Sequence, residues 1–175
     1  VEAVYWLEEA TRRNYPPAVN ALGVRCNRGQ GVQRDHVRAC RLFRQASELG
    51  NVDGTLNLAQ NIVRGWGTGR DPTRAAELYR LAISEGNAFA LYRLGELYFA
   101  GDGVEKDMGM AVEYYSRAAE KSVAPAELML GYLYANGIGV NADLFTAHFW
   151  LNRASARGYA EGRELLEQLR EHLSD

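Results

Sequence analysis

The chain has 175 residues, of which 47% are hydrophobic and 24% charged, and its net charge at pH 7 is −2. This composition excludes a disordered chain, and the lack of an apolar run of about 18 residues predicts no membrane insertion. A near-neutral charge without a lysine-rich stretch predicts that nucleic acid is not a partner. Glycine is abundant, with 18 residues against 4 prolines, and it is dispersed along the chain, as is typical of recurring turns.

The turns recur with a period of 36 residues, because the chain aligns with itself at that offset without a gap. The constant columns hold paired loop glycines, an aspartate, and small or apolar residues. They are Gly29, Gly65, Gly101 and Gly137; Gly31, Gly67, Gly103 and Gly139; Asp35, Asp71, Asp107 and Asp143; Ala39, Ala75, Ala111 and Ala147; Ala46, Ala82, Ala118 and Ala154; and Leu22, Leu58, Leu94, Leu130 and Leu166. This periodicity predicts an all-α, right-handed α-α solenoid of about five helix-turn-helix units, each of which buries its apolar face against its neighbours.

Taken in order, the sequence predicts one solenoid domain over 1–175. It begins with a partial unit that has only the second helix (B) of a repeat, which suggests a chain trimmed or processed at its start. Four full units follow, each with a first helix (A) and a second helix (B), and a capping helix with a polar outer face comes last. The partial unit is 1–14, the full units are 15–51, 52–87, 88–123 and 124–159, and the capping helix is 160–175.

Residues at the helix boundaries support this division. In the third full unit, apolar residues at helical spacing predict helix A over 88–100, and Gly101 then permits the left-handed backbone that ends a helix. Asp107 comes just before the next apolar run and is predicted to be the N-cap of helix B. Trp6 and Trp150 fall in an aromatic column of helix B, and we expect both in the core.

Two consecutive units carry the fullest form of the repeated pattern. Its residues are Leu94-Gly95, Tyr98, Gly101-Asp102-Gly103-Val104, Asp107, Ala111, Tyr114-Tyr115 and Ala118-Ala119, and then Leu130-Gly131, Tyr134, Gly137-Ile138-Gly139-Val140, Asp143, Ala147, Trp150-Leu151 and Ala154. The pattern resembles the Sel-one-like repeat, a 36-residue relative of the tetratricopeptide repeat. The resemblance implies a non-enzymatic scaffold that binds a protein or peptide partner along a groove. The alternative it implies is a bacterial immunity protein that neutralises a secreted toxin such as a phospholipase. The compartment is left open, with the bacterial periplasm or cell envelope favoured.

The sequence contains no recognisable catalytic, cofactor or metal site, so we expect neither an enzyme nor a bound cofactor. The histidines His36, His148 and His172 lack the spacing of metal ligands, which favours surface or structural roles. The loop glycines follow a helix and recur in every full unit, so they are interpreted as turns rather than as a nucleotide-binding loop. Cys26 and Cys40 are interpreted as two buried thiols, with a disulfide as the alternative.

Charge is distributed unevenly along the chain. Residues 1–51 hold eight arginines and five acidic residues, and 52–87 hold four of each sign. Residues 88–123 hold four basic and six acidic residues, and 124–175 hold four basic and seven acidic residues. The predicted solenoid therefore carries opposite charge at its two ends, and such a gradient can orient a partner during encounter.

Candidate partner-binding positions lie in helix A, which in the related tetratricopeptide repeats lines the concave groove. By this resemblance, the groove residues are Asn20, Asn27, Leu56, Gln60, Arg64, Phe89, Tyr92, Glu96, Phe99, Leu128, Tyr132 and Asn136. Among them, Phe89, Tyr92, Phe99 and Tyr132 are predicted to form an aromatic patch of the kind that anchors protein interfaces. Packing between neighbouring A helices is the alternative for each of the four aromatic residues.

Trp66 is a separate candidate, in the loop of the second full unit. It occupies a column that holds Gln30, Asp102 and Ile138 in the other units, so no packing rule of the repeat requires a tryptophan there. Exposed tryptophans often act as interface anchors. We therefore predict a partner contact at Trp66.

Overall fold

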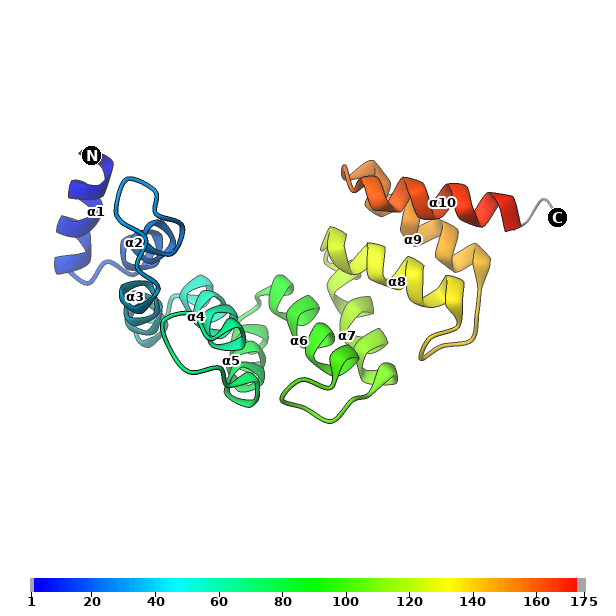
Figure 1. The fold of residues 1–175 in the computed structure, drawn as a ribbon, viewed down its shortest axis with the longest axis horizontal. Helices are drawn as coiled ribbons and strands as arrows, with labels where there is room; N and C mark the ends of the chain where they lie inside the picture. The colour runs from blue at the N-terminus through cyan, green and yellow to red at the C-terminus, as the bar shows by residue number, and fades with distance from the viewer. Residues whose placement is uncertain (1, 173–175) are drawn as a thin grey trace. The chain divides into compact units, whose positions relative to one another are not determined.

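The computed structural model describes the backbone of residues 2–172 and the side chains of residues 4–169, so the expectation for His172 lies outside the described side chains. Over this part of the chain it contains ten α-helices (Figure 1). They are α1 (Glu2–Arg12), α2 (Pro16–Arg28), α3 (His36–Glu48), α4 (Val52–Arg64), α5 (Pro72–Ser84), α6 (Ala88–Ala100), α7 (Met108–Glu120), α8 (Ala124–Asn136), α9 (Leu144–Ala156) and α10 (Ala160–His172). The odd-numbered helices are the B helices of the repeat and the even-numbered ones are the A helices, which confirms the predicted all-α repeat array.

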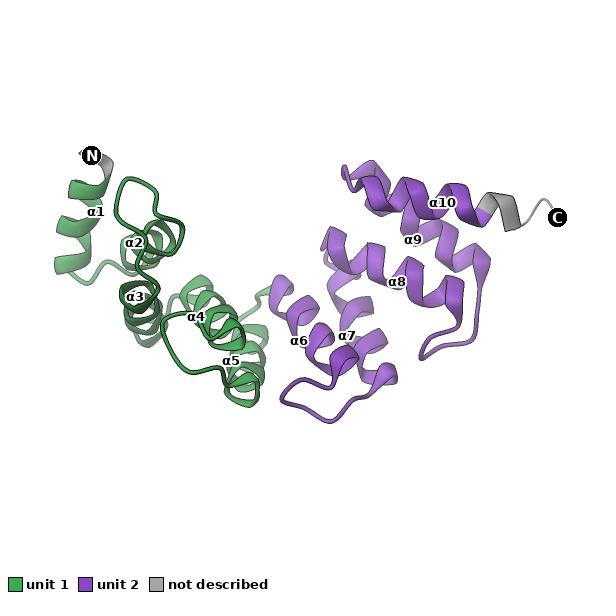
Figure 2. Cartoon of the chain, viewed as in Figure 1, with its two compact units in different colours: residues 1–87 green, residues 88–175 purple. Residues whose placement is uncertain are grey.

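The chain divides into two compact units, residues 1–87 and 88–175 (Figure 2). In unit 1, α1 to α5 pack in sequence, each on the next. In unit 2, α6 to α10 do the same, and α10 also contacts α8. Each unit therefore contains the neighbour-to-neighbour packing of a repeat protein. The single domain that the sequence predicts remains a prediction.

The predicted aspartates cap the B helices. Each accepts a hydrogen bond from a backbone N–H in the first turn of its helix, which satisfies a donor that has no partner within the helix. The pairs are Asp35 with Arg38 (2.8 Å), Asp71 with Arg74 (2.9 Å), Asp107 with Met110 (2.9 Å) and Asp143 with Thr146 (3.1 Å). At the other boundary, Gly101 follows α6 with φ 71°, the left-handed conformation that the sequence predicted there.

The constant leucine and alanine columns form the core of each unit. The leucine column is buried in every full unit, from Leu22 to Leu130, and Leu166 continues it in α10. The two alanine columns of the B helices are fully buried as well. Small side chains at these positions let the helices approach closely, which explains why alanine recurs there.

The second loop glycine has a steric role that its column alone does not reveal. Gly67 has φ 72° and lies directly against the first residue of α3. A Cβ atom at Gly67 would lie 1.9 Å from the carbonyl oxygen of His36, which no side chain can accommodate without a backbone shift. The loop of one repeat therefore rests on the start of the B helix of the repeat before it.

The core predictions for Trp6 and for the two cysteines have different outcomes. The prediction for Trp6 is wrong, because its side chain is 62% exposed, whereas Trp150 is half-buried. Among the described helices, α1 packs mainly on α2 and meets α3 through the Glu8–Arg38 ion pair, and these contacts leave Trp6 largely uncovered. Cys26 and Cys40 are buried free thiols, and burial raises the pKa of both, which disfavours the reactive thiolate.

Candidate partner-binding surface

A polar hollow on the A-helix surface of unit 1 brings together four of the predicted binding residues. Asn27, Gln60, Arg64 and Trp66 all line it, and its volume is about 370 Å³. The other lining residues come from α2, the following loop, α3 and α4. They are Val24, Arg28, Arg34, His36 and Asn57. We call this site the unit 1 hollow.

Hydrogen bonds between amide side chains hold the base of the unit 1 hollow. Asn27 Nδ2 donates to Asn61 Oδ1 (3.1 Å), and Asn61 Nδ2 donates in return to Asn27 Oδ1 (3.3 Å). His36 Nδ1 lies 2.6 Å from the same Asn27 oxygen. Because that oxygen can only accept, the ring nitrogen is the donor, and this fixes the orientation of the imidazole. Asn20 accepts a hydrogen bond from Asn57 beside this group (2.9 Å).

Trp66 covers the imidazole of His36. The two rings stack with centroids 4.9 Å apart, and the guanidinium of Arg64 lies over the indole at 4.5 Å. Stacking and cation–π contacts hold the indole in place, yet 37% of Trp66 remains exposed. The tryptophan that no packing rule required is thus an accessible and ordered part of the hollow.

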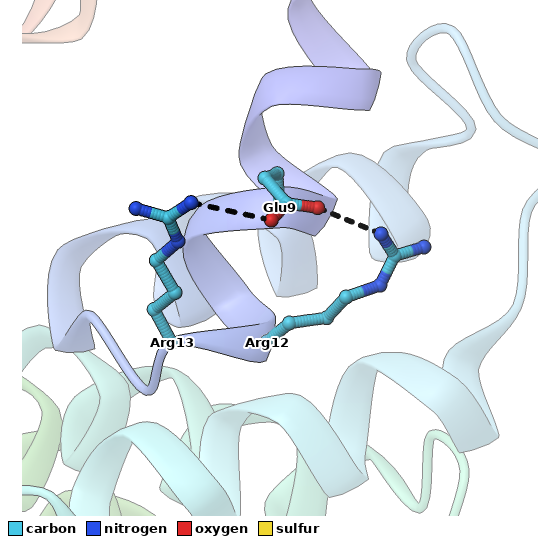
Figure 3. Close-up of polar contacts among 3 residues, drawn as sticks. All are labelled: Glu9, Arg12 and Arg13. Atoms are coloured by element: carbon cyan, nitrogen blue, oxygen red, sulfur yellow. Dashed lines mark hydrogen bonds and ion pairs between the residues drawn. The ribbon is translucent and has the colours of Figure 1, made fainter.

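Six of the twelve arginines of unit 1 form two groups that differ in their ion pairs. In the first, Arg12 and Arg13 both pair with Glu9, at 2.7 and 3.6 Å (Figure 3), and Arg38 pairs with Glu8 at 2.7 Å. The second group lines the hollow and consists of Arg28, Arg34 and Arg64. Within the described part of the chain, these three form no ion pair, so their charge is not neutralised locally.

In unit 2, the A-helix surface of α6 carries an aromatic and charged cluster. Phe89 and Tyr92 are in ring contact at 5.5 Å, and the guanidinium of Arg93 lies over both rings, at 4.9 and 5.4 Å. The Tyr92 hydroxyl donates to Glu96 (2.8 Å), and its ring also contacts buried Tyr115 at 5.8 Å. Burial, with a smaller contribution from the Glu96 hydrogen bond, raises the pKa of Tyr92. Tyr92 therefore has a packing role as well as an accessible edge.

The remaining aromatic residues of the predicted patch are Phe99 and Tyr132. Tyr132 is 38% exposed and, with Asn136, lines a hollow of about 280 Å³ between α8, α9 and α10. Leucines supply much of the rest of its lining, including Leu165 and Leu169. Phe99 is half-buried, and among the described residues neither Phe99 nor Tyr132 makes a ring contact with Phe89 or Tyr92.

The predicted groove positions are accessible with one exception. Leu56 is only 8% exposed, so it belongs to the core and offers almost no surface to a partner. Leu128 is half-buried. The A-helix columns that vary between repeats are thus largely accessible, whereas the constant leucine and alanine columns are buried.

Two exposed aromatic residues on α9 were not predicted from the sequence. Phe145 is 85% and Phe149 49% exposed. The signal was present, because the column of Phe149 holds Arg41, Glu77 and Glu113 in the other units. Polar residues in the other units indicate that this position is exposed. The phenylalanine at the same position is therefore expected to be exposed as well.

The described residues contain no group of three or more His, Cys, Asp or Glu side chains placed to hold a metal ion. In the same part of the chain, no helix has the length and apolar character needed to cross a membrane. A larger hollow of about 720 Å³ lies on the B-helix side of unit 1, where arginines and the acidic Glu48 and Asp71 line it together.

Three solved structures illustrate what the chain is similar to. A protective antigen from uropathogenic Escherichia coli is 28% identical with a TM-score of 0.86, and the match covers 97% of this chain and 36% of that one. A Sel1 repeat protein from Oxalobacter formigenes is 29% identical with a TM-score of 0.88, over 93% of this chain and 65% of the other. An immunity protein from Pseudomonas aeruginosa is 24% identical with a TM-score of 0.62, over 93% of this chain and 59% of the other. The chain thus spans less than two thirds of each of these proteins.

A comparison with curated proteins gave no match. The family model described as the Sel1 repeat matches five consecutive stretches of the chain, with borders close to those of the predicted units. The stretches are 1–15, 16–51, 52–87, 88–123 and 124–159. The chain belongs to the Sel1 repeat family.

Proposed function

We propose that the chain is a non-enzymatic scaffold that binds a protein or peptide partner through the surface of its A helices. The observation that carries this proposal is the division of the repeat columns. The constant leucine and alanine columns are buried, whereas the variable A-helix columns line a hollow in each unit. Variation at accessible positions of a fixed framework is what allows a repeat protein to recognise a particular partner.

The test uses a peptide library displayed on phage and panned on the immobilised chain. For the peptides selected, Tyr132→Ala is expected to weaken binding by about thirtyfold, the loss typical of a residue at the centre of an interface. Tyr132 is preferred to Tyr92 because the Tyr92 ring packs on Tyr115, so that its removal would also affect stability.

Phe145→Ala is the matched control, since it removes an exposed aromatic side chain from a B helix. It is expected to change affinity by less than about twofold, as surface residues outside an interface do. Loss of binding in Phe145→Ala with full binding in Tyr132→Ala would instead place the partner on the B helices and contradict the proposal.

An immunity role would be a narrower version of the same function, with a toxin as the partner. The Pseudomonas aeruginosa immunity protein is similar to this chain in fold alone, so we propose only the broader binding role. Rescue of bacterial growth on co-expression with a toxic effector would establish the narrower one.

A further inference from the structure

The unit 1 hollow has a chemistry that the scaffold proposal does not specify. Its lining includes Arg28, Arg34 and Arg64, and no described residue that lines it is acidic. Guanidinium groups bind carboxylates with paired, charge-assisted hydrogen bonds, and they do so best when no internal carboxylate competes. Elsewhere in the same unit, Arg12 and Arg13 are paired with Glu9, a carboxylate that would compete with a ligand for their guanidinium groups (Figure 3).

The base of the hollow is already ordered before any ligand arrives. The Asn27–Asn61 pair orients His36, and the imidazole of His36 in turn supports the indole of Trp66. Asn61 is buried, so the support comes from the core of the unit rather than from its surface. A site ordered in advance loses less conformational entropy on binding, which favours affinity.

The charge of the surrounding unit has the same sign as the hollow. Residues 1–87 contain twelve arginines and nine acidic residues, a net +3, whereas residues 88–175 contain eight basic and thirteen acidic residues, a net −5. A negatively charged segment is therefore attracted to unit 1 and repelled by unit 2. An apolar segment finds little to contact here, because Val24 and Trp66 are the only apolar residues among the described lining.

We propose that the unit 1 hollow binds an acidic segment of a partner protein, an inference that rests on the proposed function. The carboxylates of the segment's Asp or Glu side chains pair with Arg28, Arg34 and Arg64. The peptide chain between them lies against the exposed part of the Trp66 indole. The volume of about 370 Å³ is within the range of small ligand sites and suits a few residues of an extended segment.

The test measures the fluorescence anisotropy of a labelled peptide of eight glutamates at about 0.15 M salt, with a peptide of eight glutamines as the reference. We expect the glutamate peptide to bind at least about tenfold more tightly, and Arg64→Glu to weaken it by about tenfold or more. Arg41→Glu is the matched control, since it makes the same charge change at an exposed position of α3 that does not line the hollow. It is expected to have an effect of less than about threefold, as a distant screened charge does.

The indole N–H resonance of Trp66, assigned with Trp66→Phe, locates the peptide. It is expected to shift on addition of the glutamate peptide while those of Trp6 and Trp150 do not. Equal weakening by Arg41→Glu and Arg64→Glu would overturn the proposal, because it would show general attraction to a basic unit. Binding of inorganic phosphate that depends on Arg64, without binding of the peptide, would overturn it as well. Binding of library peptides that depends on Tyr132 would survive either result, so failure here is distinct from failure of the scaffold function.

Discussion

Ser122 adopts a backbone conformation that glycine adopts at the matching position of other repeats. Its φ is 64°, and its column holds Gly50, Gly86 and Gly158, with φ of 78°, 92° and 92°. A left-handed conformation places Cβ close to the backbone, which costs an ordinary residue about 1–2 kcal/mol. Ser122→Gly should remove this cost, although the freer glycine loses more entropy on folding. We expect a net gain in unfolding free energy of about 0.5–1 kcal/mol.

Urea denaturation followed by circular dichroism measures this change. Ser116→Gly is the matched control, because Ser116 lies inside α7, where glycine weakens the helix by about 0.5 kcal/mol. The two substitutions should therefore move the urea midpoint in opposite directions. A lower midpoint for both would show that the conformation of Ser122 is not strained.

Glu127 is a buried charged residue that the repeat pattern does not predict. Its carboxylate is fully buried in α8, and Arg153 of α9 and Arg157, directly after α9, hold it at 2.8 and 3.0 Å. The column of Glu127 holds Leu91 in the preceding unit, so the pattern alone suggests an exposed exception rather than a buried charge. Burial of a charge depends on partners that come from another helix, and these become visible only once the helices are packed.

At the scale of helices and loops, Gly67 predicts a strong effect of a small substitution. Gly67→Ala would place a methyl group within 1.9 Å of the His36 carbonyl oxygen and would hold alanine at φ 72°. We expect a loss of about 2–4 kcal/mol in the unfolding free energy, the range for overpacking combined with backbone strain. Thermal and urea unfolding measure it.

Gly69→Ala is the control for that substitution, two residues further along the same loop. A Cβ at Gly69 meets no atom within 4 Å, and its φ is not positive. Alanine there should be neutral or slightly stabilising, by up to about 0.5 kcal/mol, because it restricts the unfolded chain. Similar losses for the two variants would contradict the steric role assigned to Gly67.

Helix boundaries were the most predictable feature of this chain. Helix A of the third full unit was expected over 88–100, and α6 spans Ala88–Ala100. Caps, glycine stops and apolar spacing all act locally, so they can be read in sequence. The unit 1 hollow was predictable only in part. Helix columns indicated Asn27, Gln60 and Arg64, but His36 joins them through a stacking contact with Trp66 that no column encodes.

For the whole molecule, the neighbour-to-neighbour packing predicts that stability is regional. Within each unit, helices contact mainly those adjacent in the chain, so a perturbation should weaken with distance in sequence. Hydrogen–deuterium exchange should become faster in α2 to α5 in Gly67→Ala, with much less change in α8 to α10. Ser122→Gly should slow exchange around α7 and α8 and leave α2 and α3 unchanged. Equal changes throughout the chain would show a single cooperative unit instead.

The positions of the two cysteines make thiol labelling a probe of local opening. Both lie in residues 1–87, and both are buried thiols. A reagent that labels thiols can therefore reach them only when this half of the protein opens, while the other half contains no thiol to react. The natural sequence thus carries its own chemical probe, and the labelling rate reports the opening of α2 and α3 separately from events elsewhere in the chain.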